Sequence, residues 1–309
     1  MITQLEPPSS EGYSGGFRRR GSQEVAWSRS GGTFRFVPLP STPLDRMSAA
    51  DRAAGADRGV DRGALERSRL VVHPASARVV LEVLRRPDDS AGDLTKVILT
   101  DPALAAAVLR SANSAHLGYS RRIGGVRRAT VMLGTGLVNS LAASRVADLV
   151  FDTEAPDYPD WLWLHSIATA CAASVLARRV GEAPDEAYTA GLLHEVGWLL
   201  GAGAGVAHPE HDHAEIGGLL LSRWNLPDRI TAAVRMHHAR PDGLVAPLDR
   251  VVVAARSFAV ALGATGPEHT LDSMEALQLL QLRNVRQPAV MQEIEAELAA
   301  VTSDLVGAR

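Results

Sequence analysis

The sequence predicts an all-α protein. Aromatic residues make up only 5% of the 309 residues, and Ala, Leu and Val supply most of the apolar side chains, whereas strands are usually richer in β-branched and aromatic residues. After residue 70, apolar residues recur at the three- and four-residue spacing of helices. No alternation of useful length and no internal repeat interrupts that pattern. A hydrophobic content of 46% is enough for a sizeable core.

The first 68 residues differ from the rest of the chain. They are rich in Gly, Ser, Pro and Arg and show little periodicity. Such a segment buries too little apolar surface to offset its ordering entropy. We therefore expect residues 1–68 to be a disordered leader, with one short helix at 48–58. The arginines at 18–20 could contact nucleic acid or acidic lipid, but a solvated charge run is the simpler interpretation.

An N-terminal helical half is expected over residues 69–151. Asp101 followed by Pro102 indicates a helix start, with an Asp cap and proline at the first helical position. The sequence Gly134-Thr135-Gly136 is expected to interrupt the last helix of this half. The predicted helices span 76–86, 91–99, 102–112, 126–133 and 137–150.

A second helical half is expected over residues 155–265, after a proline-containing break at 152–160. Its predicted helices span 161–180, 185–200, 213–224, 227–238 and 248–262. Residues 266–309 are expected to form a C-terminal extension with helices at 273–282 and 287–302. These two helices could pack on the domain or pair two copies of the chain as a homodimer.

Charge and cysteine content narrow the protein class. A net charge of -3 gives no general reason to expect nucleic acid or an anionic membrane as a partner. Cys171 is the only cysteine, which excludes an intrachain disulfide and fits a reducing compartment. There is no run of ~18 uncharged apolar residues for a membrane span and no apolar N-terminal run typical of a signal peptide. We expect a cytoplasmic protein.

Seven of the ten histidines fall between residues 165 and 238. Several continue the apolar stripe of a predicted helix: His213, for example, lies three residues before Ile216. A lone histidine on such a face is usually a core residue, but four such faces together predict a buried cluster. Imidazole and carboxylate groups are ligands for Fe, Mn, Zn or Ni. The candidate metal ligands are His165, His194, Glu195, His213, His237, His238 and Asp249. His208 and His211 are expected in a surface loop.

Two sets of residues resemble a known family. The first half contains Asp101-Pro102-Ala103-Leu104, the segment Arg-Ser-Ala-Asn-Ser-Ala at 110–115, and Leu133-Gly134; the second contains Leu193-His194-Glu195-Val196-Gly197 and His237-His238. Over about residues 70–263 the chain resembles the HDOD (HD-related output) domain of the HD superfamily in bacteria. The resemblance implies an all-α fold and a regulatory role, usually without demonstrated catalysis.

One position departs from the family pattern. The HD motif is His followed by Asp, but His194 is followed by Glu195. The extra methylene moves the carboxylate by on the order of 1 Å, which argues against dinuclear catalysis. The remaining histidines resemble the metal ligands of HD-GYP cyclic-dinucleotide phosphodiesterases, although the Gly-Tyr-Pro motif of that group is absent.

Two functions remain open. The first is a stand-alone, non-catalytic signalling module that binds a partner protein or a nucleotide second messenger such as a cyclic dinucleotide. The second is a metal-dependent phosphohydrolase or cyclic-nucleotide phosphodiesterase with Fe, Mn or Zn. Glu195 favours the first and the nearly complete histidine set favours the second. A third function, nucleic-acid binding, is supported only by the arginine-rich leader.

Arg110 and Asn113 are candidates for contact with a ligand. Asparagine is unfavourable inside a helix, so a hydrogen bond from Asn113 to a neighbouring loop is the simpler explanation for this residue. Arg110 is simply explained as a solvated surface residue.

Overall fold

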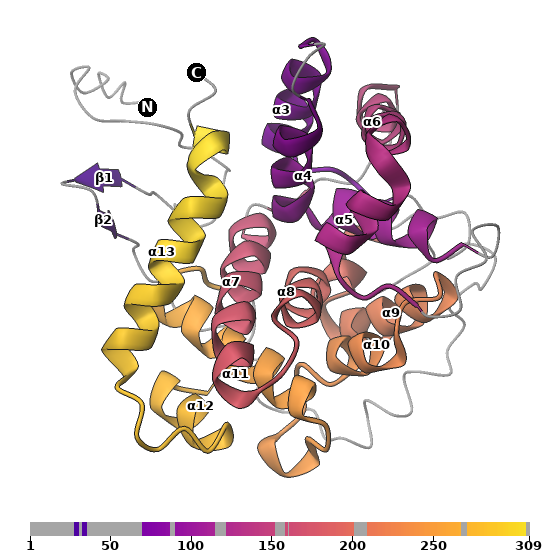
Figure 1. The fold of residues 1–309 in the computed structure, drawn as a ribbon. Coiled ribbons are helices and arrows are strands. Elements are labelled where there is room, and N and C mark those ends of the chain that lie inside the picture. The colour runs from indigo at the N-terminus through magenta and orange to yellow at the C-terminus, as the bar shows by residue number, and fades with distance from the viewer. Residues whose placement is uncertain are drawn as a thin grey trace, which may run out of the picture.

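The computed structural model describes residues 28–30, 33–35, 70–86, 90–114, 122–151, 158–159, 161–200, 209–266 and 271–306. Within these ranges the chain is almost entirely helical, which confirms the predicted all-α class (Figure 1). Two short antiparallel strands, β1 (Ser28–Ser30) and β2 (Thr33–Arg35), lie in the leader. Strands of three residues are too short to show an alternating pattern and were not anticipated. The helix expected at 48–58 lies outside the described residues.

Four helices make up most of the described residues of the N-terminal half. Asp101 caps its helix as predicted: one carboxylate oxygen accepts hydrogen bonds from the backbone N–H groups of Ala103 (2.9 Å) and Leu104 (3.0 Å). The first helix of this half is capped by His73, whose Nδ1 accepts from the Ala75 N–H. Gly134, with φ +73°, interrupts the last helix at the predicted position. The four are α3 (Pro74–Leu84), α4 (Ser90–Thr100), α5 (Pro102–Ala112) and α6 (Val126–Phe151).

The second half is arranged around a buried central helix, α7. Helices α8 and α11 both pack on it. Its approach to α8 is close at Gly191, where a Cβ atom would lie 2.8 Å from the Thr169 carbonyl oxygen. The elements are α7 (Leu162–Val180), α8 (Pro184–Leu193), the 3-10 turn η2 (Val196–Leu200), α9 (Pro209–Arg223), α10 (Asp228–Arg235), the 3-10 turn η4 (Pro241–Gly243) and α11 (Pro247–Ala261).

Two predictions about this half were wrong. The helix expected over 185–200 ends at Leu193, turns at His194 and Glu195, and resumes as η2. Helix α9 begins at Pro209, so His211 lies in a helix rather than in the predicted loop. His208 lies outside the described residues.

The C-terminal helices α12 (Ser273–Leu279) and α13 (Gln287–Val306) pack on the domain. Helix α13 lies along α7 and also contacts α3 and α4, so it touches both halves (Figure 1). Val290 and Ile294 are fully buried in this contact. Arg178 on α7 pairs with Glu297 at 2.5 Å. One hydrophobic core runs through both halves. None of the described helices is long and apolar enough to cross a bilayer.

Candidate metal centre

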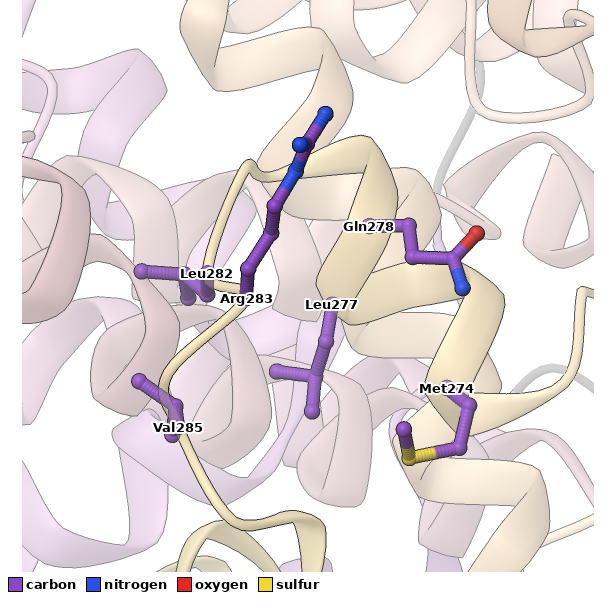
Figure 2. A pocket seen from close by; sticks show the side chains of 6 residues that line it. All are labelled: Met274, Leu277, Gln278, Leu282, Arg283 and Val285. Atoms are coloured by element: carbon purple, nitrogen blue, oxygen red, sulfur yellow. The ribbon is translucent and has the colours of Figure 1, made fainter.

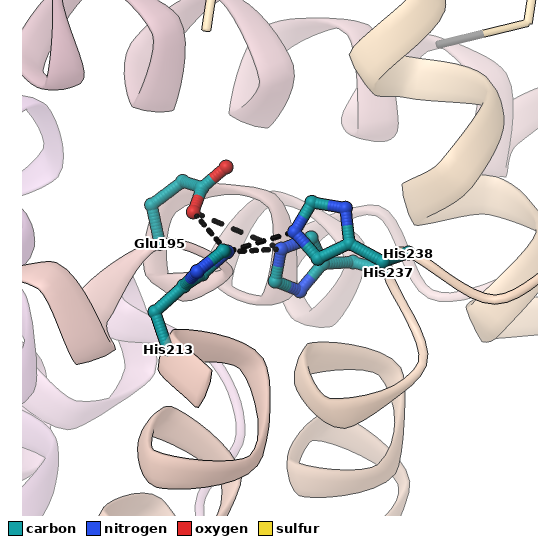
Figure 3. Close-up of side chains that lie close together, drawn as sticks. All are labelled: Glu195, His213, His237 and His238. Atoms are coloured by element: carbon teal, nitrogen blue, oxygen red, sulfur yellow. Dashed lines mark hydrogen bonds and ion pairs between the residues drawn. The ribbon is translucent and has the colours of Figure 1, made fainter. Parts of the chain in front are cut away.

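Five histidines and one glutamate converge where α7, α8, α9 and α10 meet. Their ligand atoms form two groups, each with its atoms within 4.8 Å of one another, and Glu195 belongs to both. Figure 3 shows the larger group, in which His213, His237 and His238 face the Glu195 carboxylate. The larger group is Glu195, His213, His237 and His238, and the smaller is His165, His194 and Glu195.

The local fold explains how these side chains meet. His194 and Glu195 occupy the turn that follows α8, and His237 and His238 occupy the turn that follows α10. His213 lies in α9, directly against η2. At Gly197 in η2 a Cβ atom would overlap the His213 carbonyl oxygen, so only glycine permits this approach.

Three of the imidazoles are oriented by backbone carbonyl groups. Nδ1 of His165 lies 2.7 Å from the Ala264 oxygen, Nδ1 of His194 lies 2.7 Å from the Gly191 oxygen, and Nδ1 of His237 lies 2.5 Å from the Val234 oxygen. Because a carbonyl oxygen can only accept, each Nδ1 carries the proton. In the neutral ring Nε2 is then left with a lone pair.

The Nε2 atoms face the two oxygens of Glu195. Oε1 lies 3.3 Å from Nε2 of His194 and 3.8 Å from Nε2 of His165. Oε2 lies 2.9 Å from Nε2 of His213 and 3.7 Å from Nε2 of His237. Nε2 of His213 is also 2.7 Å from Nε2 of His238. Each carboxylate oxygen therefore faces a different pair of histidines.

Burial lowers the pKa values of three of the histidines. It lowers the pKa of His165 to about 3 and holds the pKa values of His237 and His238 well below their usual range. Burial alone would raise the pKa of Glu195, but the imidazoles of His213, His194 and His237 hold it well below its ordinary value. Burial thus disfavours the protonated form of His165, His237 and His238.

This donor set fits a metal ion. Nε2 of His165, Nε2 of His194 and both oxygens of Glu195 are buried and have no hydrogen-bond partner among the described residues. Buried polar atoms of this kind are costly unless something satisfies them. Lone pairs from nitrogen and oxygen that converge with no donor between them are satisfied by a cation. Such an ion would be held by the two groups that share Glu195.

Three other candidate residues lie outside the two ligand groups. Asp249 caps its own helix, α11, where Oδ2 accepts from the Ala246 N–H at 3.2 Å. Asn113 bonds to a neighbouring loop as predicted, although it follows the last residue of α5 rather than lying inside the helix. The Arg110 guanidinium lies over the Trp224 ring at 5.1 Å. The structure gives neither Arg110 nor Asn113 a contact with the cluster.

Sequence reasoning missed the residues that surround the cluster. Arg256 is buried in α11, and its guanidinium donates to the His237 carbonyl at 2.6 Å. The ring of Trp198 lies 5.3 Å from that of His213, and the ring of Trp161 lies 5.9 Å from that of His165. The available signal for Arg256 was a single charge within the apolar run of α11.

A surface pocket occurs at the C-terminal helices. It has a volume of about 320 Å³ and is formed by α12 and the turn after it (Figure 2). Apolar side chains make up most of its lining, and none of the predicted site residues takes part. The lining residues are Met274, Leu277, Gln278, Leu282, Arg283 and Val285.

Two domain families match the chain. The HDOD domain matches residues 70–206 and the HD domain matches residues 162–297. The two matches overlap across the turn that contains His194 and Glu195. This chain therefore contains HDOD and HD domains. The assignment confirms the resemblance on which the sequence prediction rested.

The curated relatives share only part of their length with this HDOD protein. It is 28% identical to an uncharacterized protein of Treponema pallidum over 196 residues, which is 54% of this chain and 37% of the relative. It is 34% identical to ribonuclease Y of Acholeplasma laidlawii over 125 residues, which is 39% of this chain and 22% of the relative. The chain thus spans well under half the length of these proteins.

The fold also resembles solved structures. A fragment of the MmoQ response regulator of Methylococcus capsulatus is 26% identical, with a TM-score of 0.55, and the match covers 68% of this chain and 90% of the fragment. A virulence factor of Campylobacter jejuni shares the fold with a TM-score of 0.51 at 14% identity, over 81% of this chain and 98% of the other.

Proposed function

We propose that this HDOD protein is a signalling module that acts by binding, with a metal ion held in the buried centre around Glu195. Its partner would be another signalling protein or a nucleotide second messenger such as a cyclic dinucleotide. The likeness to the MmoQ response regulator supports a signalling role. Homodimer formation would be compatible with this role.

The burial of the metal ligands is the observation that favours a binding module over an enzyme. His165, His194 and His237 are 0% exposed, and Glu195 and His213 are 1% exposed. A catalytic metal keeps a coordination position open to water and substrate, whereas a closed site holds its metal for structure. Ligands as buried as these favour a closed site.

Metal analysis tests this proposal. Protein purified without chelator should contain Fe, Mn or Zn in a stoichiometric amount, measured by inductively coupled plasma mass spectrometry. His194→Ala and His237→Ala should each lose most of it, because each removes a ligand from one of the two groups. His73→Asn, which changes a histidine outside both groups, should retain it. A metal-free wild-type protein from metal-supplemented cells would overturn the proposal.

A second candidate function is a metal-dependent phosphodiesterase or phosphohydrolase. The division of the Glu195 oxygens between two histidine groups favours it, because a carboxylate in that position can bridge two metal ions. The similarity to ribonuclease Y also supports it. The test is an assay under reducing, metal-replete conditions with cyclic dinucleotides, simple phosphoesters and single-stranded RNA. Turnover that disappears in Glu195→Gln would establish this function, and no turnover would leave the binding module.

A further inference from the structure

A short loop of the N-terminal half lies against two helices of the metal centre. This loop, residues 122–125, is called the wedge loop below. It precedes α6 and contacts the N-terminal ends of both α8 and α10. Ile123, Gly124 and Gly125 are buried. The wedge loop is therefore part of the interior that joins the two halves.

Its contact with α8 is made by backbone. A Cβ atom at Gly124 would lie 3.0 Å from the side chain of Glu186, and one at Gly125 would lie 3.2 Å from Cβ of Asp185. One residue further, the Val126 N–H donates to Oγ1 of Thr189 at 3.4 Å. The first turns of α8 are thus packed directly on the loop.

Its contact with α10 is equally close. A Cβ atom at Gly124 would lie 2.9 Å from Cδ1 of Ile230, which is fully buried. Arg122 donates to the Leu226 carbonyl at 3.3 Å and forms an ion pair with Asp228 at the start of α10. The same four residues therefore fix the starts of two helices.

The far ends of these helices carry metal ligands. His194 and Glu195 follow α8, which has 10 residues, and His237 and His238 follow α10, which has 8. Helices of this length are about 15 Å and about 12 Å long, so each connects the wedge loop directly to a ligand-bearing turn. A displacement at the wedge loop would therefore change the position of Glu195 relative to His237.

Asn113 holds the wedge loop in place. At the C-terminal end of α5, its Nδ2 donates to the carbonyls of Leu109 (3.0 Å) and Ile123 (2.9 Å). Its Oδ1 accepts from the Ile123 N–H at 2.7 Å. Both backbone groups of Ile123 thus depend on a side chain that belongs to neither ligand group.

We propose that Asn113 is a positioning residue for the metal centre, acting through the wedge loop on α8 and α10. The proposal rests on the proposed metal centre and adds that the N-terminal half sets its affinity. By reciprocity, metal in the centre tightens the wedge loop. A partner that shifts this loop would change the metal affinity by the factor by which metal changes the affinity for that partner.

Metal affinity in a matched pair of variants tests the proposal. Asn113→Asp keeps the size and the acceptor but replaces the donor to two carbonyls with an oxygen. Zinc affinity, measured by competition with a fluorescent chelator below the melting temperature of each variant, should fall about 5- to 100-fold. Val146→Ala also removes buried contacts in the N-terminal half but leaves the wedge loop untouched, and should stay within about twofold of wild type. Equal weakening in both variants, or none in Asn113→Asp, would overturn the proposal.

Hydrogen exchange supplies the reciprocal readout. Zinc should slow exchange of the Ile123 and Val126 amides more than that of the Val80 amide in α3. Unchanged exchange at Ile123 in zinc-loaded protein would count against the coupling while leaving the metal centre intact. Failure of the wild-type protein to bind zinc, iron or manganese would remove both the centre and the coupling.

Discussion

The two oxygens of Glu195 reach two different pairs of histidines, which bears directly on the one departure from the HD motif. From the sequence, the extra methylene argued against a bridging role. In the structure the carboxylate lies inside the cluster, with Oε2 at 2.9 Å from His213 and Oε1 at 3.3 Å from His194. The turn after α8 makes this possible, because Glu195 is not constrained by helical geometry. Glutamate at this position is therefore compatible with metal binding.

Substitution of Glu195 should separate the effects of charge and reach. Glu195→Gln keeps the shape but removes the negative charge of the centre, and metal affinity should fall at least about tenfold. Glu195→Asp keeps the charge and restores the aspartate of the HD motif while shortening the reach by one methylene, so it should retain more metal per chain than Glu195→Gln. Equilibrium dialysis with elemental analysis measures both. Wild-type affinity in Glu195→Gln would contradict the assignment of this residue as a ligand.

His73 should make stability depend on pH. Its Nδ1 caps α3 and its ring stacks on Trp163, and burial lowers its pKa from 6.5 to about 4. An unfolded chain takes up the proton near pH 6.5, whereas the folded chain does so only near pH 4. The stability that the neutral His73 ring contributes is therefore complete above pH 6.5 and is lost as pH falls through 4, by about 3 kcal/mol.

The comparison with His73→Asn isolates this contribution. Asparagine also caps a helix but does not titrate. In urea unfolding at pH 8 the wild type should be the more stable protein, because the variant lacks the ring that stacks on Trp163. At pH 5 the difference should narrow by about 2 kcal/mol. A difference that stays constant between the two pH values would rule out His73 as the source.

At the scale of elements, most helices were predictable and their breaks were less so. Asp101 and Gly134 carry local signals, a cap and a positive φ, and both were placed correctly. The turn at His194 has no such signal, because Leu192 and Leu193 continue the apolar pattern. The close packing of η2 against α9 at Gly197 accounts for the turn at His194. That contact depends on the tertiary fold, so periodicity could not show it.

The site was predictable to a similar extent. Histidines on the apolar faces of separate helices predicted that these helices meet at a buried cluster. The prediction was possible because the apolar face of a helix can be recognised from the sequence of that helix alone. Asp249 also lies on a buried helix, but a short carboxylate at a helix start bonds to its own backbone, and it belongs to neither ligand group. Arg256 comes near the cluster only because α11 crosses behind His237.

Helix α13 should contribute to stability through its apolar face. Ile294 is fully buried against the domain, and Ile294→Ala should cost about 2 to 4 kcal/mol in urea unfolding. Glu293 pairs with Arg178 and Arg179, but its side chain is only about half-buried, so Glu293→Gln should cost less than about 1 kcal/mol. A larger loss in the charge variant would mean that the ion pairs, rather than burial, hold the helix.

At the scale of the whole molecule, one core joins both halves, and α13 contacts both. A ligand that binds only the folded chain stabilises everything that unfolds with it. Metal at 100 times its dissociation constant should therefore add about 2.7 kcal/mol. For a domain of this size, that corresponds to a rise of about 5 to 10 °C in melting temperature. Because the core is continuous, calorimetry should show one transition that moves as a unit.

Calorimetry tests this rise in melting temperature. The wild type and Glu195→Gln are each measured with added metal and with chelator. The wild type should shift more than the variant, because the variant lacks the charge that the ion pairs with and binds the metal more weakly. A transition that splits on metal addition, with only one component moving, would show that the halves unfold separately. In that case the N-terminal half could not be energetically linked to the metal centre through the wedge loop, so this measurement tests the coupling independently of Asn113.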